Sequence, residues 1–142
     1  MTDPDLIAKK LAFIETCVTE LQTLARPEML ATDVREERFV EHTLQLAVQA
    51  ILDVASHIVS DDRLGEPKTN YALFDLLCGA GWIDDGQRNL LRRMAGFRNL
   101  VVHGYMAVDL QIVRSILDNH LGDLLAFVQV VRAKLPHLDD AR

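Results

Sequence analysis

The sequence is poor in the residues that usually build metal sites or disulfide frameworks. Only two of its 142 residues are cysteines, Cys17 and Cys78, and neither belongs to a CxxC pair. His42, His120 and His137 do not cluster with cysteines or with each other at ligand spacing, so we expect no metal and no other cofactor. The simplest interpretation of the cysteines is two reduced core thiols in a cytoplasmic protein.

Aromatic residues are also scarce, at 6% of the chain against 49% hydrophobic residues. An interior of leucine, valine and alanine suits packed helices better than a β-sandwich. The chain shows no strand-like alternation, internal repeat, glycine-rich phosphate loop or low-complexity segment. It also has no basic-then-apolar leader and no uncharged apolar run near about 18 residues, so we expect neither secretion nor membrane insertion. A chain of 142 residues is expected to form a single domain, residues 1–142.

What the sequence does contain is helical periodicity along most of its length. Apolar residues step by three and four over residues 7–25, 40–59 and 110–135, and shorter helices are expected over residues 70–78 and 84–103. Capping residues precede these segments: Asp3, Thr32 or Asp33, Thr69 or Asn70, Asp84, and Asp109. About five helices predict an all-α fold, an up-and-down antiparallel helical bundle. The last helix is expected to run unbroken from Asp109, with a frayed tail after about residue 135.

Negative charge is missing from one window of an otherwise acidic chain. The net charge is -6, yet residues 86–108 contain no Asp or Glu and do contain Arg88, Arg92, Arg93, Arg98 and His103. A local cationic patch on an acidic protein can select a phosphate at one place and repel it elsewhere. The alternative interpretation is a solvated helix face that carries three arginines.

The positive window ends in the run Arg98-Asn99-Leu100-Val101-Val102-His103-Gly104-Tyr105. Arg98 keeps its charge and presents a planar fork that fits phosphate oxygens, and His103 can give or take a proton near neutral pH. Gly104 can end a helix and turn the chain. An arginine and a histidine without a carboxylate pair or metal cluster favour phosphodiester chemistry such as RNA cleavage, which needs a base, an acid and a cation.

The spacing of this run raises a geometric problem. Residues five apart on a regular helix diverge by about 140°, so Arg98 and His103 cannot hold one phosphate together unless the helix is distorted. The run also supplies one imidazole where the reaction needs two proton-transfer groups. A two-fold homodimer that brings two copies of the run together would solve both problems. The plain alternative is that Arg98 pairs with a core carboxylate and His103 caps the helix end.

The pattern Arg-x4-His-x-Tyr, with Asn after the Arg, resembles the signature of the HEPN superfamily, specifically its HepT-like toxins. The flanking sequences agree: Ser56-His57-Ile58 precedes an acidic loop, and Met94-Ala95-Gly96-Phe97 leads into the run. The resemblance extends from about residue 5 to about residue 135. It implies an all-helical homodimer whose Arg-x4-His elements meet across the dimer.

The resemblance also implies an activity and a partner. The family members are metal-independent endoribonucleases, toxins of type VII-like toxin–antitoxin pairs, encoded beside a minimal nucleotidyltransferase antitoxin. In this chain Arg98 would hold the scissile phosphate, His103 would be the acid or base, and Asn99 would orient the phosphate or the imidazole. Tyr105 would receive AMP from the partner, which neutralises the toxin. Possible RNA-binding residues are Arg88, Arg92 and Arg93.

Two other functions stay open at this point. The chain could be a non-catalytic HEPN module that binds a nucleotide or sequesters a nucleotidyltransferase, or a structural helical dimer whose polar run only ends a helix. Three further polar residues have ordinary interpretations. His57 is interpreted as a structural residue near a helix end, with a place in the active site as the alternative. Asp61 and Asp62 are interpreted as capping or solvent-exposed, because no third oxygen ligand lies at a recognisable spacing.

Overall fold

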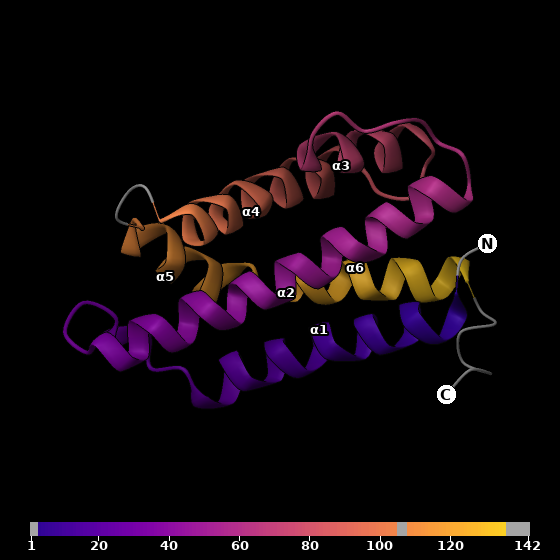
Figure 1. The fold of residues 1–142 in the computed structure, drawn as a ribbon. Helices are drawn as coiled ribbons and strands as arrows, with labels where there is room; N and C mark the ends of the chain where they lie inside the picture. The colour runs from indigo at the N-terminus through magenta and orange to yellow at the C-terminus, as the bar shows by residue number, and fades with distance from the viewer. Residues whose placement is uncertain (1–2, 105–107, 136–142) are drawn as a thin grey trace.

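The computed structural model describes residues 3–104 and 108–135, and over this part of the chain every regular element is helical. The elements are α1 (Pro4–Leu24), a 3-10 turn η1 (Pro27–Met29), α2 (Val34–Asp61), α3 (Asn70–Gly79), α4 (Asp85–His103), α5 (Leu110–Asn119) and α6 (Leu121–Lys134). They form an elongated bundle in which neighbouring long helices run roughly antiparallel (Figure 1). The predicted all-α bundle is confirmed.

Short polar side chains fix where the helices begin. The carboxylate of Asp33 accepts a hydrogen bond from the amide of Arg35 at 2.9 Å, and the Thr69 hydroxyl accepts one from Ala72 at 3.2 Å. At the start of α4, Asp84 accepts from the Gln87 amide at 2.7 Å while the Gln87 side chain accepts from the Asp84 amide at 3.0 Å. This reciprocal capping box satisfies amides that the helix itself leaves without partners.

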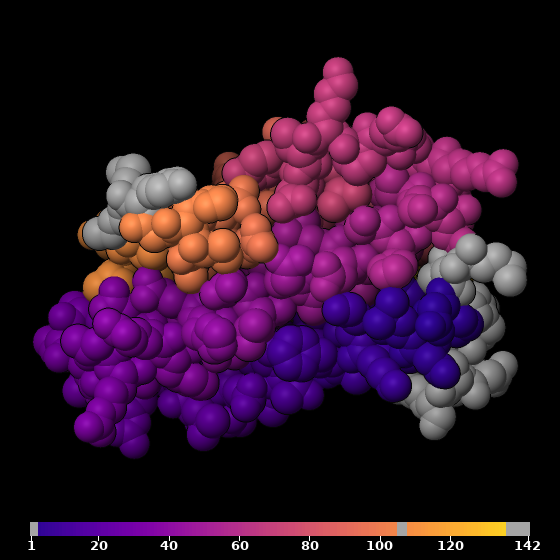
Figure 2. All heavy atoms as spheres, viewed as in Figure 1, coloured from indigo at the N-terminus to yellow at the C-terminus, as the bar shows by residue number. Residues whose placement is uncertain are grey.

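Helix α2 is the central element and contacts α1, α3 and α4. Its length and apolar composition match those of a membrane-spanning helix, but 61% of its most apolar window is buried inside the bundle. Burial against neighbours on several sides therefore accounts for its hydrophobicity. Figure 2 shows that the end of α4 (orange) reaches the molecular surface beside the N-terminal half of α2 (purple).

The segment predicted as one last helix is divided into α5 and α6 at His120. The backbone there has φ -125° and ψ 1°, and the His120 ring nitrogen Nδ1 lies 3.0 Å from a carboxylate oxygen of Asp123. The apolar series through Leu117, Leu121 and Leu124 continues across the break, which is why periodicity alone did not reveal it. The break lets α5 face α4 while α6 packs on α1.

The two cysteines differ in their surroundings. Cys17 is buried in the core at 2% exposure, and burial, followed by the nearby charge of Glu20, raises its pKa to about 11. Cys78 is only partly buried, although it packs against the same core. Both are free thiols. The prediction of unpaired cysteines is confirmed for both, and the core position fits Cys17 better than Cys78.

Candidate functional site

The run from Arg98 to His103 forms the last turn and a half of α4. The helix stays regular to its end, where Gly104 adopts a left-handed conformation with φ +64° and donates its amide to the Leu100 carbonyl at 3.0 Å. A non-glycine residue would be strained at this φ. Because the helix is undistorted, Arg98 and His103 point in directions about 140° apart. Tyr105 lies outside the described residues.

A groove of about 800 Å³ separates the C-terminal half of α4 from α5. His103 and Asn99, one helical turn apart, line it together with Arg93, which lies nearer the start of α4. Its walls are largely apolar and include Leu100 and Ile112, which are 42% and 50% exposed. The groove therefore places an imidazole and a carboxamide at the edge of an uncovered apolar surface.

Arg98 does not line this groove. It is half-buried, and its Nη1 donates a hydrogen bond to Oδ1 of Asn99 at 3.0 Å. Its Nε is buried and has no hydrogen-bond partner among residues 3–104 and 108–135. An unsatisfied buried N–H of a guanidinium is costly, so a movement of the side chain that gave Nε an oxygen acceptor would be favourable.

The geometry does not match the plain alternative considered for this run. In the described part of the chain Arg98 forms no ion pair with a carboxylate, and His103 is exposed rather than buried. Gly104 supplies the helix cap through its backbone, so the His103 side chain is not required for that purpose. The guanidinium of Arg98 is thus not neutralised by any carboxylate of the described residues.

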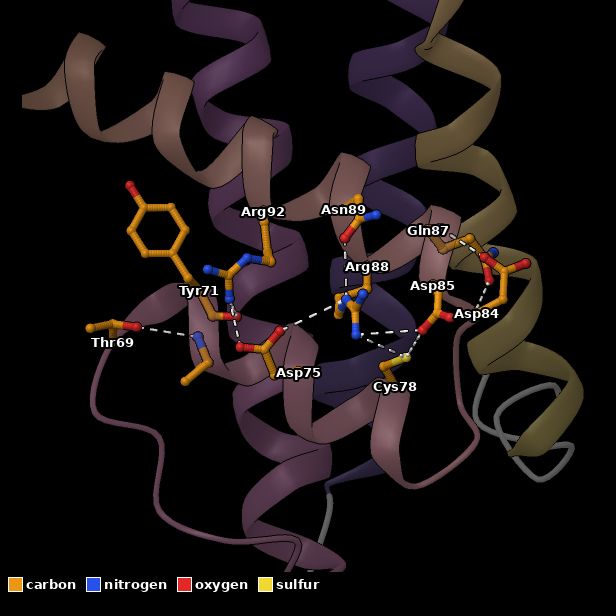
Figure 3. Close-up of polar contacts among 11 residues, drawn as sticks. Thr69, Tyr71, Asp75, Cys78, Asp84, Asp85, Gln87, Arg88, Asn89 and Arg92 are labelled. Carbon is orange, nitrogen blue, oxygen red and sulfur yellow. Dashed lines mark hydrogen bonds and ion pairs between the residues drawn. The ribbon is translucent and has the colours of Figure 1, made fainter.

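The three arginines in the first half of α4 are divided between two environments, and Figure 3 shows two of them, Arg88 and Arg92. Arg92 Nη1 lies 2.6 Å from Asp75 of α3, and Arg88 lies 4.0 Å from Asp75 and 3.4 Å from Asp85. The stretch that lacks acidic residues in the sequence is therefore partly neutralised in space by Asp75 of α3 and by Asp85 at the start of α4. Arg93 is exposed and lines the groove instead.

A second, shallower hollow of about 540 Å³ lies where Val101 of α4 approaches α2. Arg38, Glu41 and His42 of α2 line it. Burial raises the pKa of the Glu41 carboxyl, the charge of Glu37 raises it further, and Arg38 partly offsets both effects. The two hollows lie on either side of α4, so the end of this helix is exposed on two faces.

Sequence reasoning missed one residue of the site, Tyr71 of α3. Its hydroxyl accepts a hydrogen bond from Nδ2 of Asn99 at 3.2 Å, and its side chain lines the groove. The two residues are 28 positions apart, so no local pattern connects them. The available signal was Gly96, because a glycine inside a helix often marks the close approach of a neighbour. A Cβ at Gly96 would lie 3.6 Å from the Tyr71 hydroxyl.

The remaining polar residues do not join the site. His57 is half-buried near the end of α2 and lines neither hollow, and Asp61 and Asp62 are exposed where α2 ends. Within residues 3–104 and 108–135, no group of three or more His, Cys, Asp or Glu side chains is placed to hold a metal ion.

Fold and site together define a helical-bundle protein of the HEPN type, with arginine, carboxamide and imidazole at the exposed end of a helix. The chain belongs to the HepT-like family, described as ribonuclease HepT-like, which matches residues 13–131. The family resemblance predicted from the Arg98 to Tyr105 run is confirmed.

Individual relatives agree with this assignment. The chain is 30% identical over 131 residues to the mRNA nuclease HepT of Shewanella oneidensis, covering 92% of this chain and 98% of that protein. The tri-AMPylated HEPN toxin of Shewanella oneidensis, solved in complex with MNT antitoxin, is 30% identical, has a TM-score of 0.85, and is matched over 94% of this chain and 99% of its own. A toxin–antitoxin structure with AMP-PNP gives a TM-score of 0.86 at 30% identity, over 91% and 98% of the two chains.

Proposed function

We propose that this protein is the toxin of a type VII-like toxin–antitoxin pair and acts in the cytoplasm as a metal-independent endoribonuclease. The observation that carries the proposal is the state of Arg98. Its guanidinium is oriented by Asn99 and meets no carboxylate in the described part of the chain. A phosphate oxygen is the acceptor that suits this fork best.

The chemistry follows from the groups at the end of α4. The 2′-hydroxyl of RNA attacks the adjacent phosphorus, the bond to the 5′-oxygen breaks, and a 2′,3′-cyclic phosphate and a 5′-hydroxyl result. One imidazole removes the 2′-hydroxyl proton and a second group protonates the leaving oxygen. His103 serves in these proton transfers, and Arg98 neutralises the charge that develops on the phosphate.

A homodimer is part of this proposal. One chain supplies one His103, and its regular helix turns Arg98 away from that histidine. The uncovered apolar side chains Leu100, Val102 and Ile112 are 42%, 43% and 50% exposed beside the run, which suits a surface that pairs with its own copy. Two-fold pairing through this surface would place the arginine of one protomer near the histidine of the other.

Neutralisation by a nucleotidyltransferase antitoxin is the regulatory half of the proposal. Tyr105 follows His103 by two residues, and the related Shewanella oneidensis toxin is tri-AMPylated in its complex with MNT antitoxin. AMP groups on Tyr105 would add negative charge and bulk beside Arg98 and His103. They would occupy the position of the substrate phosphate and repel RNA.

The decisive experiment measures cleavage of labelled RNA by the full chain in EDTA. His103→Ala is expected to lower the rate by about 100-fold or more, because general acid–base catalysis of this kind contributes about 10²–10⁴-fold. His57→Ala, a histidine outside both hollows, is the matched control and should stay within about two-fold of wild type. Products should carry 2′,3′-cyclic phosphate ends. Equal rates for wild type and His103→Ala, or no cleavage by either, would overturn the nuclease proposal in favour of a non-catalytic module.

A further inference from the structure

Tyr71 lies at a place where α3 meets the end of α4. It is the second residue of α3, is half-buried, and lines the same groove as Asn99 and His103. Gly96 faces its hydroxyl, and a Cβ there would meet it at 3.6 Å, an ordinary van der Waals contact, so the tyrosine lies directly against α4. The position brings a hydroxyl from a separate helix to the base of the proposed active-site run.

Hydrogen bonds link this hydroxyl to Arg98 through one carboxamide. Asn99 Nδ2 donates to the Tyr71 hydroxyl at 3.2 Å, and Arg98 Nη1 donates to Oδ1 of the same Asn99 at 3.0 Å. An amide rotated by 180° would turn its NH₂ group toward the guanidinium, so that two donors would face each other. Because Arg98 can only donate, it selects the orientation in which Oδ1 faces the guanidinium, and the Tyr71 hydroxyl, by accepting from Nδ2, limits rotation of the carboxamide out of this position.

The ring of Tyr71 is itself held in place from the other side. The guanidinium carbon of Arg92 lies 5.5 Å from the ring centroid, and Arg92 is fixed by its ion pair with Asp75. Figure 3 shows the tyrosine hydroxyl pointing away from this ion pair. A cation above a ring face restricts the ring without using the hydroxyl. The hydroxyl is thus presented to Asn99 by a side chain with little freedom to move.

We infer that Tyr71 is a positioning residue of the nuclease site: it locks the Asn99 carboxamide, and the carboxamide in turn aims the Arg98 guanidinium at the scissile phosphate. The inference rests on the proposed function. Tyr71 transfers no proton and touches no reacting atom. Its effect passes through Asn99, so it should disappear when Asn99 cannot form the bridge.

A double-mutant cycle tests this route. Tyr71→Phe removes only the hydroxyl and is expected to lower kcat for RNA cleavage about five-fold, with KM within about two-fold and an unshifted pH profile. In the background of Asn99→Ala the same substitution should change kcat by less than about two-fold. An equal loss in both backgrounds, a shifted pH profile, or a Tyr71→Phe rate equal to wild type would each overturn the inference.

Two further measurements separate this inference from folding and from the proposed function. Thermal unfolding of each variant shows whether a loss of rate follows a loss of structure, and the midpoint temperature of Tyr71→Phe should lie within about two degrees of that of wild type.

In NMR spectra of the RNA-free protein, Tyr71→Phe should shift the signals of the Asn99 side-chain amide and of Arg98 Nε, while a control substitution on another helix, Thr23→Val, leaves both signals in place. Unchanged signals would refute the hydrogen-bonded arrangement itself. Cleavage by wild type without any Tyr71 effect refutes the inference alone, whereas no cleavage by wild type refutes the proposed function.

Discussion

The two halves of α4 carry the same kind of residue in different settings. In the first half, residues 85–94, Arg88 and Arg92 reach the carboxylates of Asp75 and Asp85. In the second half, residues 95–103, Arg98 reaches only the neutral carboxamide of Asn99 among the described residues. The first half thus connects α4 to α3, whereas in the second half no described carboxylate compensates the charge of Arg98.

The difference between the two halves of α4 comes from the side chains that α3 presents to them. It places a carboxylate, Asp75, against the start of α4 and a neutral hydroxyl, Tyr71, against its end. A carboxylate would hold a guanidinium in place but cancel its charge, whereas a neutral acceptor orients the group and leaves the charge for a ligand. The Arg92–Asp75 pair is 40% and 48% exposed, so it contributes only about 0–1 kcal/mol to stability.

The strongest test of this comparison exchanges each arginine for lysine. Arg98→Lys keeps the charge but loses the planar fork, so single-turnover RNA cleavage should fall by about 100-fold. Arg92→Lys keeps its ion pair with Asp75 and should stay within about three-fold of wild type. Circular dichroism should show both variants folded.

Comparable losses in the two lysine variants would remove the distinction between the halves of α4. If only Arg92→Lys lost cleavage activity, the roles of the two halves would be reversed, and the phosphate would have to bind nearer to α3.

Much of this arrangement was predictable, because it depends on residues close together in the sequence. Caps at Asp33, Thr69 and Asp84 set helix starts within one turn of the side chain that caps them. Gly104 ends α4 where expected, since a left-handed conformation is accessible to glycine without strain. The apolar seams identified helices for the same reason, as each depends on a local repeat.

The parts that escaped prediction depend on long-range contacts. Asp75 neutralises an arginine 17 residues away, and Tyr71 meets Asn99 across 28 residues. A charge count along the chain could not show either. The break at His120 escaped for a different reason, because the helix resumes in a register that keeps Leu117, Leu121 and Leu124 on the packed side.

A smaller difference is expected between Arg93 and Arg92 in the salt dependence of RNA binding. When an arginine side chain neutralises a phosphate of RNA, the counterion of that phosphate is released. For single strands, each such contact contributes about -0.7 to the slope of log K for binding against the log of the salt concentration. Arg93→Gln should reduce the slope measured with a 2′-deoxy substrate analogue by about 0.7, because Arg93 is exposed and lines the groove. Arg92→Gln, which loses a side chain already paired with Asp75, should change it by less than about 0.3. If the two variants changed the slope equally, the ion pair between Arg92 and Asp75 would not prevent Arg92 from contacting RNA phosphates.

The smallest effect concerns the carboxylate that faces the second half of α4 from α2. Burial raises the pKa of Glu41, so the folded protein binds its proton more tightly than the unfolded chain does. The stability that this protonation contributes is present at low pH and is lost as pH rises through the elevated pKa. Glu41→Gln removes the charge without changing the shape, so urea unfolding at pH 7 should show a slightly more stable variant. At pH 4, below the ordinary carboxyl value of 4.5, the two proteins should be equally stable. If Glu41→Gln were more stable than wild type by the same amount at pH 7 and at pH 4, packing rather than charge would be responsible. A loss of stability at pH 7 would mean that the attraction between Glu41 and Arg38 outweighs the cost of burial.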